Sequence, residues 1–534
     1  MAPDRVVRRS TALLVLAALC LCAPLVRADV KPAALFTDNM VIQREARAPV
    51  WGTADPGEKV TVTLGAETAA ATAGADGRWS VKIATLKAGG PLELAIRGNN
   101  TVTLKNVMAG DVWVCSGQSN MGMTMSWGVN NREAEIAAAN YPKIRLFTVK
   151  RTVAEKPLDD ATGSWAECSP GSVRGFSAAA YFFGRDLFKK IDVPIGLINT
   201  SWGGTPVESW MRAETLADDP DYETIRGRRE WFVRSYPNEL KKYEEALAKW
   251  EAGGKQGRGP RRPAKPEDNP WCSSGLYNGM IHPLIPFAVK GAIWYQGESN
   301  AGRAYQYRKL FPAMITDWRK QWKQGDFPFL FVQLANYRAL QKNPSEAQTW
   351  PELREAQTMT LKLPATGMAV ITDVGEAADI HPGNKQAVGR RLALAARHIA
   401  YGQDIVYSGP MFDSVKFQDG RAVVTFKNVG GGLVARDVEL EDVVRENGRN
   451  VTVKVPVKGE LKGFAVAGED KKFAWAEATI DGDTIVLTSP EVPHPVAVRY
   501  GWADNPACNL FNKEGLPASP FRTDDWPGVT AGKN

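Results

Sequence analysis

Polar and apolar residues alternate in four short stretches near the start of the chain. Clusters of Gly, Asp and Asn at 55–57, 75–77 and 98–100 separate them. A period of two residues is typical of half-buried strands, and short strands at this spacing indicate a β-sandwich. We therefore predict an all-β domain over residues 29–106, interpreted as a support module rather than a carbohydrate-contacting one. The alternating stretches are 59–64, 79–83, 92–96 and 101–104.

The pattern changes near residue 107, where apolar runs become continuous and alternate with helical periodicity, as at 178–190. Strands that are apolar on both faces and alternate with helices predict a mostly parallel sheet covered on both sides. We predict an α/β domain over 107–404, with ligands bound beyond the carboxyl ends of its strands. The expected strands are 112–114, 144–147, 193–199, 291–295, 329–332 and 368–371.

A charged segment at 213–270 interrupts this α/β pattern. Leu240, Tyr243, Leu247 and Trp250 recur at helical spacing and predict one amphipathic helix. The basic, Gly- and Pro-rich stretch 253–265 lacks apolar periodicity, and we interpret it as a solvated loop rather than a surface for an acidic partner.

The end of the chain, 405–534, is again rich in alternating residues. Strands are expected at 423–426, 464–467 and 484–488, between turns such as Asp419-Gly420. This region is predicted to form a second β-rich module with an irregular tail.

The first 28 residues have the features of a secretory signal peptide. A start containing Arg5, Arg8 and Arg9 precedes an apolar run, and Val26-Arg27-Ala28 offers a cleavage site after Ala28. Arg8-Arg9 and the cysteines at 20 and 22 fit the twin-arginine and lipidation motifs poorly. We therefore expect an exported protein, periplasmic or extracellular, without a membrane segment after cleavage.

Composition narrows the functional classes. A chain of 534 residues with 44% hydrophobic and 23% charged residues is expected to form two to four globular domains. Part of the net charge of +7 lies in the leader and the 213–270 segment, which argues against nucleic-acid binding. The sequence does not indicate an oligomeric state.

Cysteine and histidine usage argues against a protein-built metal site. Beyond the leader the cysteines are Cys115, Cys168, Cys272 and Cys508, too widely spaced for a disulfide framework, and their pairing is left open. The chain has four histidines and no Cys-x-x-Cys or His-Glu-x-x-His motif. His282, His398 and His494 are interpreted as structural.

Four loops that follow predicted strands carry residues suited to one reaction. The first presents Ser119, the second a Gly203-Gly204 pair, the third Gln296 and the fourth His381. A hydroxyl, an imidazole with a nearby carboxylate, and amide donors for an oxyanion are the groups that acyl transfer needs. The loops are 117–121, 199–210, 294–300 and 372–382.

These blocks resemble those of the sialate O-acetylesterase family, within the SGNH (GDSL-like) hydrolases. The matching segments are Gly-Gln-Ser-Asn-Met, Trp-Gly-Gly-Thr-Pro-Val-Glu, Trp-Tyr-Gln-Gly-Glu-Ser-Asn and Asp-Ile-His-Pro. The resemblance implies a flavodoxin-like three-layer core at 107–404 with flanking β modules. It also implies an acyl-enzyme mechanism that requires no cofactor.

By resemblance, Ser119 is the nucleophile and His381 the general base. The implied oxyanion donors are the Ser119 amide, the Gly203 amide (or that of Gly204) and Gln296, where the wider superfamily has Asn. The superfamily usually places Asp three residues before the histidine, but Ala378 occupies that position here. Asp379 is the preferred acid; the alternatives are Asp373 or a backbone carbonyl that orients the histidine.

Further candidates for substrate contact are Asn120, Gly204, Glu298 and Trp294. Glu298 is expected to brace its loop rather than to act as an acid. Trp202, Trp210, Trp294 and Tyr295 are either core aromatics or sugar platforms.

The expected substrate is an O-acetylated sugar or glycan. The motifs do not distinguish acetylated sialic acid from acetylated plant polysaccharide such as xylan or xyloglucan. A non-catalytic carbohydrate-binding protein is the remaining alternative, and intact Ser119 and His381 argue against it.

Overall fold

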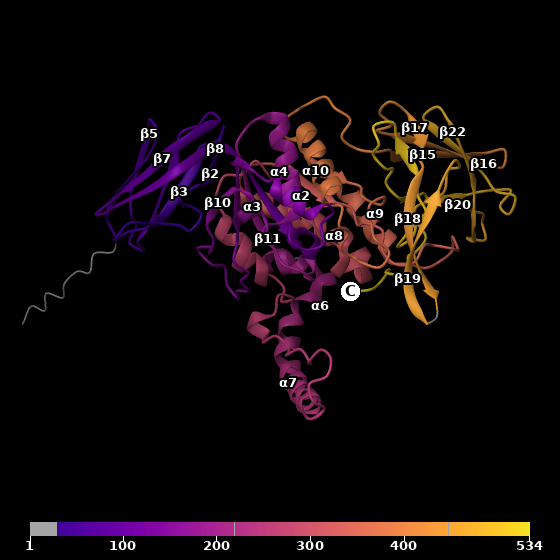
Figure 1. Ribbon diagram of the computed structural model, residues 1–534, viewed down its shortest axis with the longest axis horizontal. Helices are drawn as coiled ribbons and strands as arrows, with labels where there is room; N and C mark the ends of the chain where they lie inside the picture. Colours follow the sequence, from indigo (N-terminus) through magenta and orange to yellow (C-terminus); the bar gives the residue numbers. More distant parts are fainter. Residues whose placement is uncertain (1–28, 218, 447) are drawn as a thin grey trace, which may run out of the picture.

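A mixed sheet forms the centre of the molecule (Figure 1), and the computed structural model describes residues 29–217, 219–446 and 448–534. Its strand order is β10-β9-β11-β8-β12-β13-β14. Neighbouring strands are parallel, except that β10 runs antiparallel to β9, which confirms the predicted α/β class. The strands are β8 Thr101–Gly117, β9 Tyr141–Thr148, β10 Trp165–Cys168, β11 Ile195–Ser201, β12 Gly291–Tyr295, β13 Phe329–Val332 and β14 Thr366–Ala369.

Helices cover both faces of this sheet because its strands are apolar on both sides. On one face Trp113 of β8 packs against Phe183 of α4, with ring centroids 5.0 Å apart, and α10 belongs to the same cluster. On the other face Trp294 of β12 stacks on Phe311 of α8, and α9 completes that cluster. The helices are α4 Ala178–Ile191, α8 Ala304–Trp322, α9 Trp350–Thr360 and α10 Lys385–Ile399.

One long strand, β8, joins the N-terminal β region to the central sheet. Its first half pairs with β7 and its second half with β11 and β12. The stretches 101–104 and 112–114, predicted as separate strands, are therefore one strand, and the predicted division at 106/107 falls inside it. Asn106 has a φ of 58°, so the strand is locally irregular where the alternation breaks.

Of the N-terminal strands, β1, β3 and β6 form a small sheet in the order β1-β3-β6. The others extend the central sheet through β8, in the order β5-β4-β7-β8 with β2 also beside β8. The predicted strands at 59–64 and 79–83 correspond to β4 and β6. The bounds are β1 Lys31–Pro32, β2 Val41–Gln43, β3 Ala48–Thr53, β4 Lys59–Leu64, β5 Glu67–Thr72, β6 Arg78–Ile83 and β7 Gly89–Arg97.

The C-terminal region consists of small antiparallel sheets, as its alternation predicts. Two sheets of four strands have the orders β15-β16-β23-β22 and β21-β20-β24-β26, and β17-β25 and β18-β19 form pairs. The bounds are β15 Met411–Gln418, β16 Arg421–Lys427, β17 Leu433–Ala435, β18 Val438–Glu446, β19 Arg449–Val457, β20 Phe464–Ala467, β21 Phe473–Trp475, β22 Glu477–Asp481, β23 Thr484–Thr488, β24 Ala497–Tyr500, β25 Leu510–Asn512 and β26 Phe521–Arg522.

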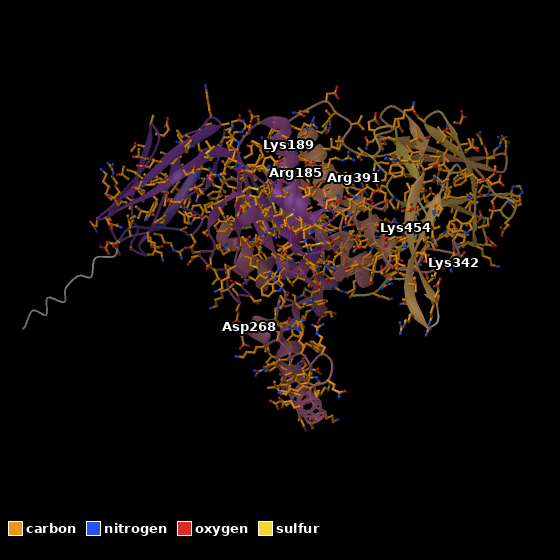
Figure 2. All side chains as sticks on the ribbon, in the orientation of Figure 1. Arg185, Lys189, Asp268, Lys342, Arg391 and Lys454 are labelled. Atoms are coloured by element: carbon orange, nitrogen blue, oxygen red, sulfur yellow. The ribbon has the colours of Figure 1, made fainter. Side chains whose placement is uncertain are left out.

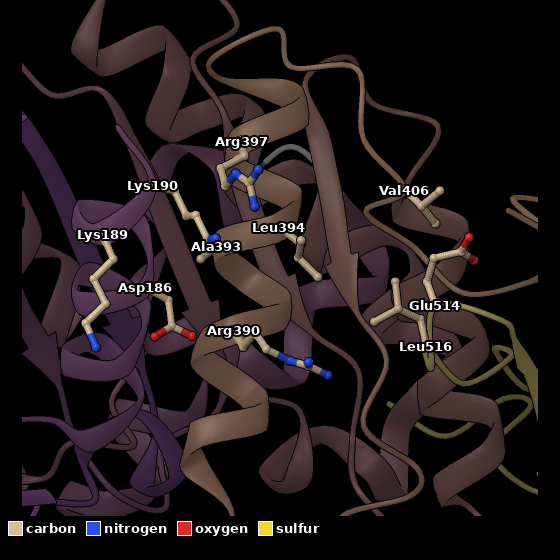
Figure 3. A pocket seen from close by; sticks show the side chains of 10 residues that line it. All are labelled: Asp186, Lys189, Lys190, Arg390, Ala393, Leu394, Arg397, Val406, Glu514 and Leu516. Atoms are coloured by element: carbon tan, nitrogen blue, oxygen red, sulfur yellow. The ribbon is translucent and has the colours of Figure 1, made fainter. Parts of the chain in front are cut away.

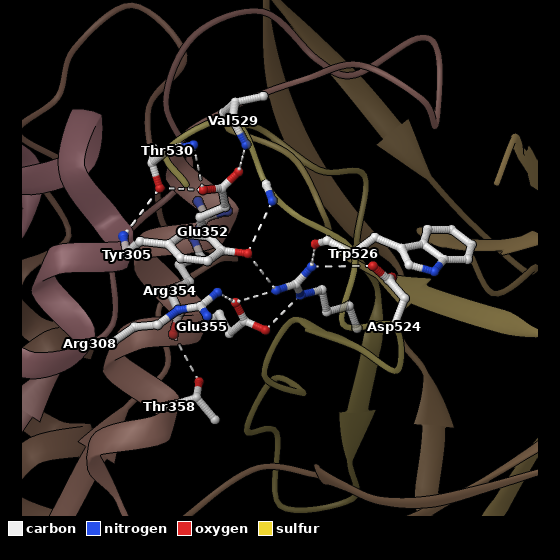
Figure 4. A network of polar contacts seen from close by, with 12 residues as sticks. Tyr305, Arg308, Glu352, Arg354, Glu355, Thr358, Asp524, Trp526, Val529 and Thr530 are labelled. Carbon is white, nitrogen blue, oxygen red and sulfur yellow. Dashed lines mark hydrogen bonds and ion pairs between the residues drawn. The ribbon is translucent and has the colours of Figure 1, made fainter. Parts of the chain in front are cut away.

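The C-terminal tail returns to the central domain (Figure 4). Buried Glu352 of α9 accepts hydrogen bonds from the backbone N–H groups of Val529 (2.5 Å) and Thr530 (3.0 Å). Arg522 forms an ion pair of 2.7 Å with Glu355 of the same helix. The tail thereby ties the C-terminal sheets to the helices that cover the core.

The charged insertion extends away from the rest of the molecule as helix α7, Arg228–Ala252 (Figures 1 and 2). None of its residues is fully buried, but the residues of the predicted stripe are half-buried. Trp250 at its end donates to the carbonyl of Gln256 and lies against Gly259, so the loop that follows covers this part of the stripe. The helix is longer than the predicted stripe, and no helix or strand is assigned in 253–265. Shorter helices before it are α5 Ala213–Ala217 and α6 Glu223–Arg226.

A cavity of about 440 Å³ lies between α4, α10 and the C-terminal region (Figure 3). Charged residues such as Asp186, Lys190, Arg390 and Glu514 line it, and it contains no predicted site residue. The four described cysteines are buried and unpaired. Within the described residues no helix is long and apolar enough to cross a membrane, and no cluster of three or more potential metal ligands occurs. The predicted signal peptide lies outside the described residues.

Candidate active site

A glycine turn at the end of β8 presents Ser119. Gly117 has a φ of 137°, and a Cβ at this position would lie 2.2 Å from the carbonyl oxygen of Tyr295 on the neighbouring strand. Only glycine fits both the conformation and the space. The chain then enters the short helix α1, Ser119–Gly122, so the hydroxyl lies beyond the carboxyl end of the central strand.

His381 reaches Ser119 from the loop between β14 and α10. Its Nε2 lies 2.9 Å from Ser119 Oγ, and its Nδ1 lies 3.1 Å from Asp379 Oδ1. The same Asp379 oxygen accepts the backbone N–H of His381 at 2.9 Å. The predicted serine, histidine and aspartate thus form a continuous chain of contacts, in which Nε2 can accept the hydroxyl proton and Asp379 can fix the tautomer.

Asp373, the alternative acid, lies in an ion pair elsewhere. Its two carboxylate oxygens accept from the two terminal nitrogens of Arg391, each at 2.6 Å. Arg391 also donates to the carbonyl of Val370, so this pair fastens α10 to the end of β14. The geometry favours Asp379 over Asp373 as the partner of His381.

Gly203 lies directly against Ser119. A Cβ on Gly203 would be 3.2 Å from Ser119 Cβ and 3.9 Å from Ser119 N. The Gly203 N–H donates to no other group in the described chain, and the first N–H of a helix such as that of Ser119 has no partner within the helix. Two free amides beside the serine hydroxyl suit an oxyanion. Gly204, with a φ of 74°, has no atom within 4 Å of its Cβ position.

Gln296, the third predicted oxyanion donor, has internal partners instead. Its side chain is fully buried, and Nε2 donates to Asn300 Oδ1 at 2.6 Å and to the carbonyl of Thr205 at 3.3 Å. Its Oε1 accepts the Tyr307 hydroxyl at 2.9 Å. These contacts do not favour an oxyanion role; they join the second and third loops.

Asn120 and Glu298 form a buried network behind the histidine rather than a substrate surface. Asn120 Nδ2 donates to Glu298 Oε1 at 2.6 Å and to the carbonyl of Ile380 at 2.9 Å. Lys385 Nζ donates to Asn120 Oδ1 and to the carbonyl of Pro382, both at 2.7 Å. The interpretation of Asn120 and Glu298 as substrate contacts is therefore not favoured, whereas the bracing expected of Glu298 agrees with these bonds.

The aromatic candidates lie largely in the core. Trp294, Trp210 and Tyr295 are fully buried, and Trp294 packs between Trp210 and Phe311. This burial does not favour the predicted contact of Trp294 with a sugar. The run of apolar neighbours in β12 already indicates burial on both faces.

Two exposed residues at the site were not identified from the sequence. Trp127 is 48% exposed, and its ring centroid lies 4.9 Å from that of His381. The exposed Arg151 donates to the carbonyl of Ser201 and lies over the Trp202 ring at 5.9 Å. Both come from irregular segments without periodicity, so only the folded chain brings them to Ser119.

Comparison with known proteins gives the site its context. The family described as "carbohydrate esterase, sialic acid-specific acetylesterase" matches residues 109–256 and 265–398, which include Ser119, Gly203, Gln296 and His381. Sialate O-acetylesterase of Mus musculus is 32% identical, with 91% of this chain and 93% of that protein covered. The Rattus norvegicus protein of the same name is 34% identical, with the same coverage. The chain belongs to this family of carbohydrate esterases.

A solved structure of similar architecture is that of a carbohydrate acetylesterase from Xanthomonas citri. It is 38% identical, has a TM-score of 0.77, and the match covers 93% of this chain and all of that one. The resemblance first seen in four short blocks thus extends over nearly the whole chain, including the flanking β regions. This family member is an esterase, as the sequence predicts.

Proposed function

We propose that this esterase removes O-acetyl groups from sugars through an acetyl-serine intermediate. The contact of 2.9 Å between Ser119 Oγ and His381 Nε2 carries the proposal. As Ser119 Oγ bonds to the acetyl carbon, its proton passes to His381 Nε2, while Asp379 stabilises the imidazolium. The amides of Ser119 and Gly203 donate to the tetrahedral oxyanion.

The intermediate then collapses as the bond between the acetyl carbon and the sugar oxygen breaks. His381 returns its proton to that oxygen, and the deacetylated sugar leaves. A water molecule, deprotonated by the same imidazole, attacks the acetyl-serine; acetate departs and Oγ regains its proton. The cycle needs no electron transfer and no cofactor.

The direct test compares acetate release by wild type and by Ser119→Ala. Removing the hydroxyl should lower kcat at least 10³-fold, because the nucleophile is lost. A matched Ser→Ala change at Ser126, a neighbouring serine outside the contact chain, should leave the rate unchanged. Equal rates for wild type and Ser119→Ala would refute the acetyl-serine mechanism.

For the sugar itself we propose acetylated sialic acid, the substrate named for the curated relatives. Arg151 supports this choice, since no carboxylate in the described chain lies within ion-pair distance of it and an acidic sugar would supply one. Acetylated xylan or xyloglucan is the second candidate, supported by exposed Trp127, since an aromatic face stacks on neutral sugars as well.

A substrate panel separates these candidates. For an acidic sugar, Arg151→Leu should raise KM about tenfold and leave the KM for neutral acetylated xylan unchanged. Preference of the wild type for xylan or xyloglucan, with no effect of Arg151→Leu, would favour the polysaccharide.

We further propose an SGNH, flavodoxin-like core at 107–404, flanked by support modules at 29–106 and 405–534. Parallel strands covered by helices on both faces support this core. Export to the periplasm or beyond, after cleavage at Ala28, is part of the same proposal. N-terminal sequencing of the mature protein tests it.

A further inference from the structure

A buried lysine lies directly behind the catalytic histidine. Lys385 is the first residue of α10, and its side chain is fully buried. The carboxylates of Glu298, Glu376 and Asp379 act electrostatically on its ammonium group, but within the described chain none of them forms an ion pair with it. Its polar partners are the Asn120 side chain and the Pro382 carbonyl, with the Tyr295 ring 5.5 Å away.

These partners hold the chain on both sides of His381. Lys385 binds the carbonyl of Pro382, the residue after the histidine, at 2.7 Å. Asn120 binds the carbonyl of Ile380, the residue before it, at 2.9 Å. Lys385 and Asn120 are themselves joined by a bond of 2.7 Å, so one connected pair fixes both ends of the histidine segment. Asn120 also directly follows Ser119, which links the two reacting residues through the same bonds.

The arrangement is unfavourable for stability alone. Desolvation lowers the pKa of Lys385 to about 7, although the charges of Glu298, Glu376 and Asp379 oppose this shift, and a cation in the first turn of a helix opposes the helix dipole. Glu298, at the far end of the network, has a buried Oε2 without a hydrogen-bond partner in the described chain, and burial raises the pKa of this carboxyl group. Two such costs at one place indicate a functional requirement.

We propose that Lys385 and Asn120 are positioning residues, which hold the His381 segment so that Nε2 faces Ser119 Oγ. The inference rests on the proposed acetyl-serine function. Neither residue touches the reacting atoms; they act through the backbone on either side of the imidazole.

The test is Lys385→Met, which keeps the length of the side chain and removes its donors. We expect kcat for acetate release to fall 10- to 100-fold, because a misplacement of about 1 Å is that costly, with KM changed less than twofold. Lys309→Met, at an exposed lysine of α8, is the matched control and should retain the wild-type kcat. Rates are normalised to folded enzyme by circular dichroism.

Two further readouts separate positioning from a merely structural role. The downfield proton resonance of the His381–Asp379 hydrogen bond should weaken or shift in Lys385→Met. The double variant Lys385→Met/Asn120→Ala should be about as slow as either single variant, because both act through one connected pair. The proposal would be overturned if the kcat losses of the two single variants multiplied in the double variant, or if the resonance were unchanged in Lys385→Met.

Asn120→Ala alone serves as the second variant if Lys385→Met is not recovered folded. A wild-type kcat in either folded variant overturns the positioning role. This failure is distinct from failure of the proposed function, since Ser119→Ala would still be inactive; if Ser119→Ala were active, the mechanism itself would be wrong.

Discussion

His381 Nε2 lies 2.9 Å from Ser119 Oγ, although 262 residues separate them in the chain. Ser119 follows β8 and His381 follows β14, two strands that are not neighbours in the sheet. Two strands, β12 and β13, lie between them, so the loop after β14 must run back along the carboxyl ends of these strands to reach the serine. The contact therefore depends on how firmly that loop is held.

Asp379, two residues before His381, should matter for catalysis, whereas Asp373, in the ion pair with Arg391, should matter for stability. We expect Asp379→Asn to lower kcat about 10²-fold, because the amide can no longer stabilise the imidazolium. The loss should be smaller than for a buried acid, since the Asp379 side chain is 56% exposed. Steady-state kinetics of acetate release measure it.

Asp373→Asn is the paired variant. It weakens the two bonds to Arg391 that fasten α10, so the midpoint of thermal unfolding should fall while kcat of the folded enzyme changes less than threefold. The reverse outcome, with activity lost in Asp373→Asn and kept in Asp379→Asn, would assign the acid to Asp373.

The two glycines of the second loop should respond differently to alanine. In Gly203→Ala the new Cβ would lie 3.2 Å from Ser119 Cβ, so the loop must move and its amide leaves the oxyanion. We expect kcat to fall about 10²-fold with KM little changed. In Gly204→Ala the space is open, and the φ of 74° costs stability of about 1 kcal/mol. A larger kcat loss in Gly204→Ala would identify Gly204 as the donor.

The fold class and the pairing of Ser119 with His381 could be predicted because both leave local signals. Apolar runs mark β12, β13 and the first half of β11, since strands buried on both faces need them. A glycine turn marks Ser119. The continuity of β8 could not be predicted, because the positive φ at Asn106 interrupts the alternation that identifies a strand.

The predicted side-chain roles that the structure does not favour depend on contacts between distant segments. Gln296 has a side-chain amide that could donate to an oxyanion. In the folded chain this amide donates instead to Asn300 and Thr205, because the second and third loops lie together. Trp294 has an aromatic ring of the kind that stacks on sugars, but its position in β12 places that ring in the core. Trp127 gives no signal in its own segment, since only the return of the chain after β14 brings it to His381. Lys385 lies four residues after His381, but its bond to Asn120 joins distant segments and leaves no local pattern.

Trp127 should contribute to sugar binding rather than to chemistry. Its exposed ring beside His381 offers a face on which the sugar that carries the acetyl group can stack. Trp127→Ala should raise KM for an acetylated sugar two- to tenfold, corresponding to about 0.5–1.5 kcal/mol of stacking. The kcat/KM for 4-nitrophenyl acetate, which has no sugar, should change less than twofold.

The control for this prediction is Trp475→Ala, at a similarly exposed tryptophan of the C-terminal region. Trp475→Ala should leave the KM for the acetylated sugar and the kcat/KM for 4-nitrophenyl acetate unchanged. Trp127→Phe, which keeps an aromatic ring, should retain most of the affinity for the sugar. Equal losses on the sugar ester and on 4-nitrophenyl acetate would show that Trp127 acts on His381 instead.

Glu208 should stabilise the site in a pH-dependent manner. Its carboxylate is fully buried and accepts bonds of 2.6 Å from both Arg228 and Arg303. Burial alone would raise the pKa of Glu208, but the two guanidinium groups and a bond from Asn300 outweigh it and lower the pKa to about 2. The folded state therefore binds this proton less readily than the unfolded state, whose pKa is near 4.5.

The sign of the effect follows from this difference. Above about pH 4.5 the carboxylate contributes its full stabilisation, about 3 kcal/mol for a shift of this size, and the contribution disappears as the pH falls through about 2. Glu208→Gln should therefore unfold at a markedly lower temperature than wild type at pH 7. This difference in unfolding temperature should become steadily smaller as the pH falls toward 2.5. Glu239→Gln, at an exposed position of α7, should unfold at nearly the wild-type temperature at both pH values. If the difference in unfolding temperature between Glu208→Gln and wild type stayed constant with pH, the stabilisation would come from the hydrogen bonds rather than from the charge.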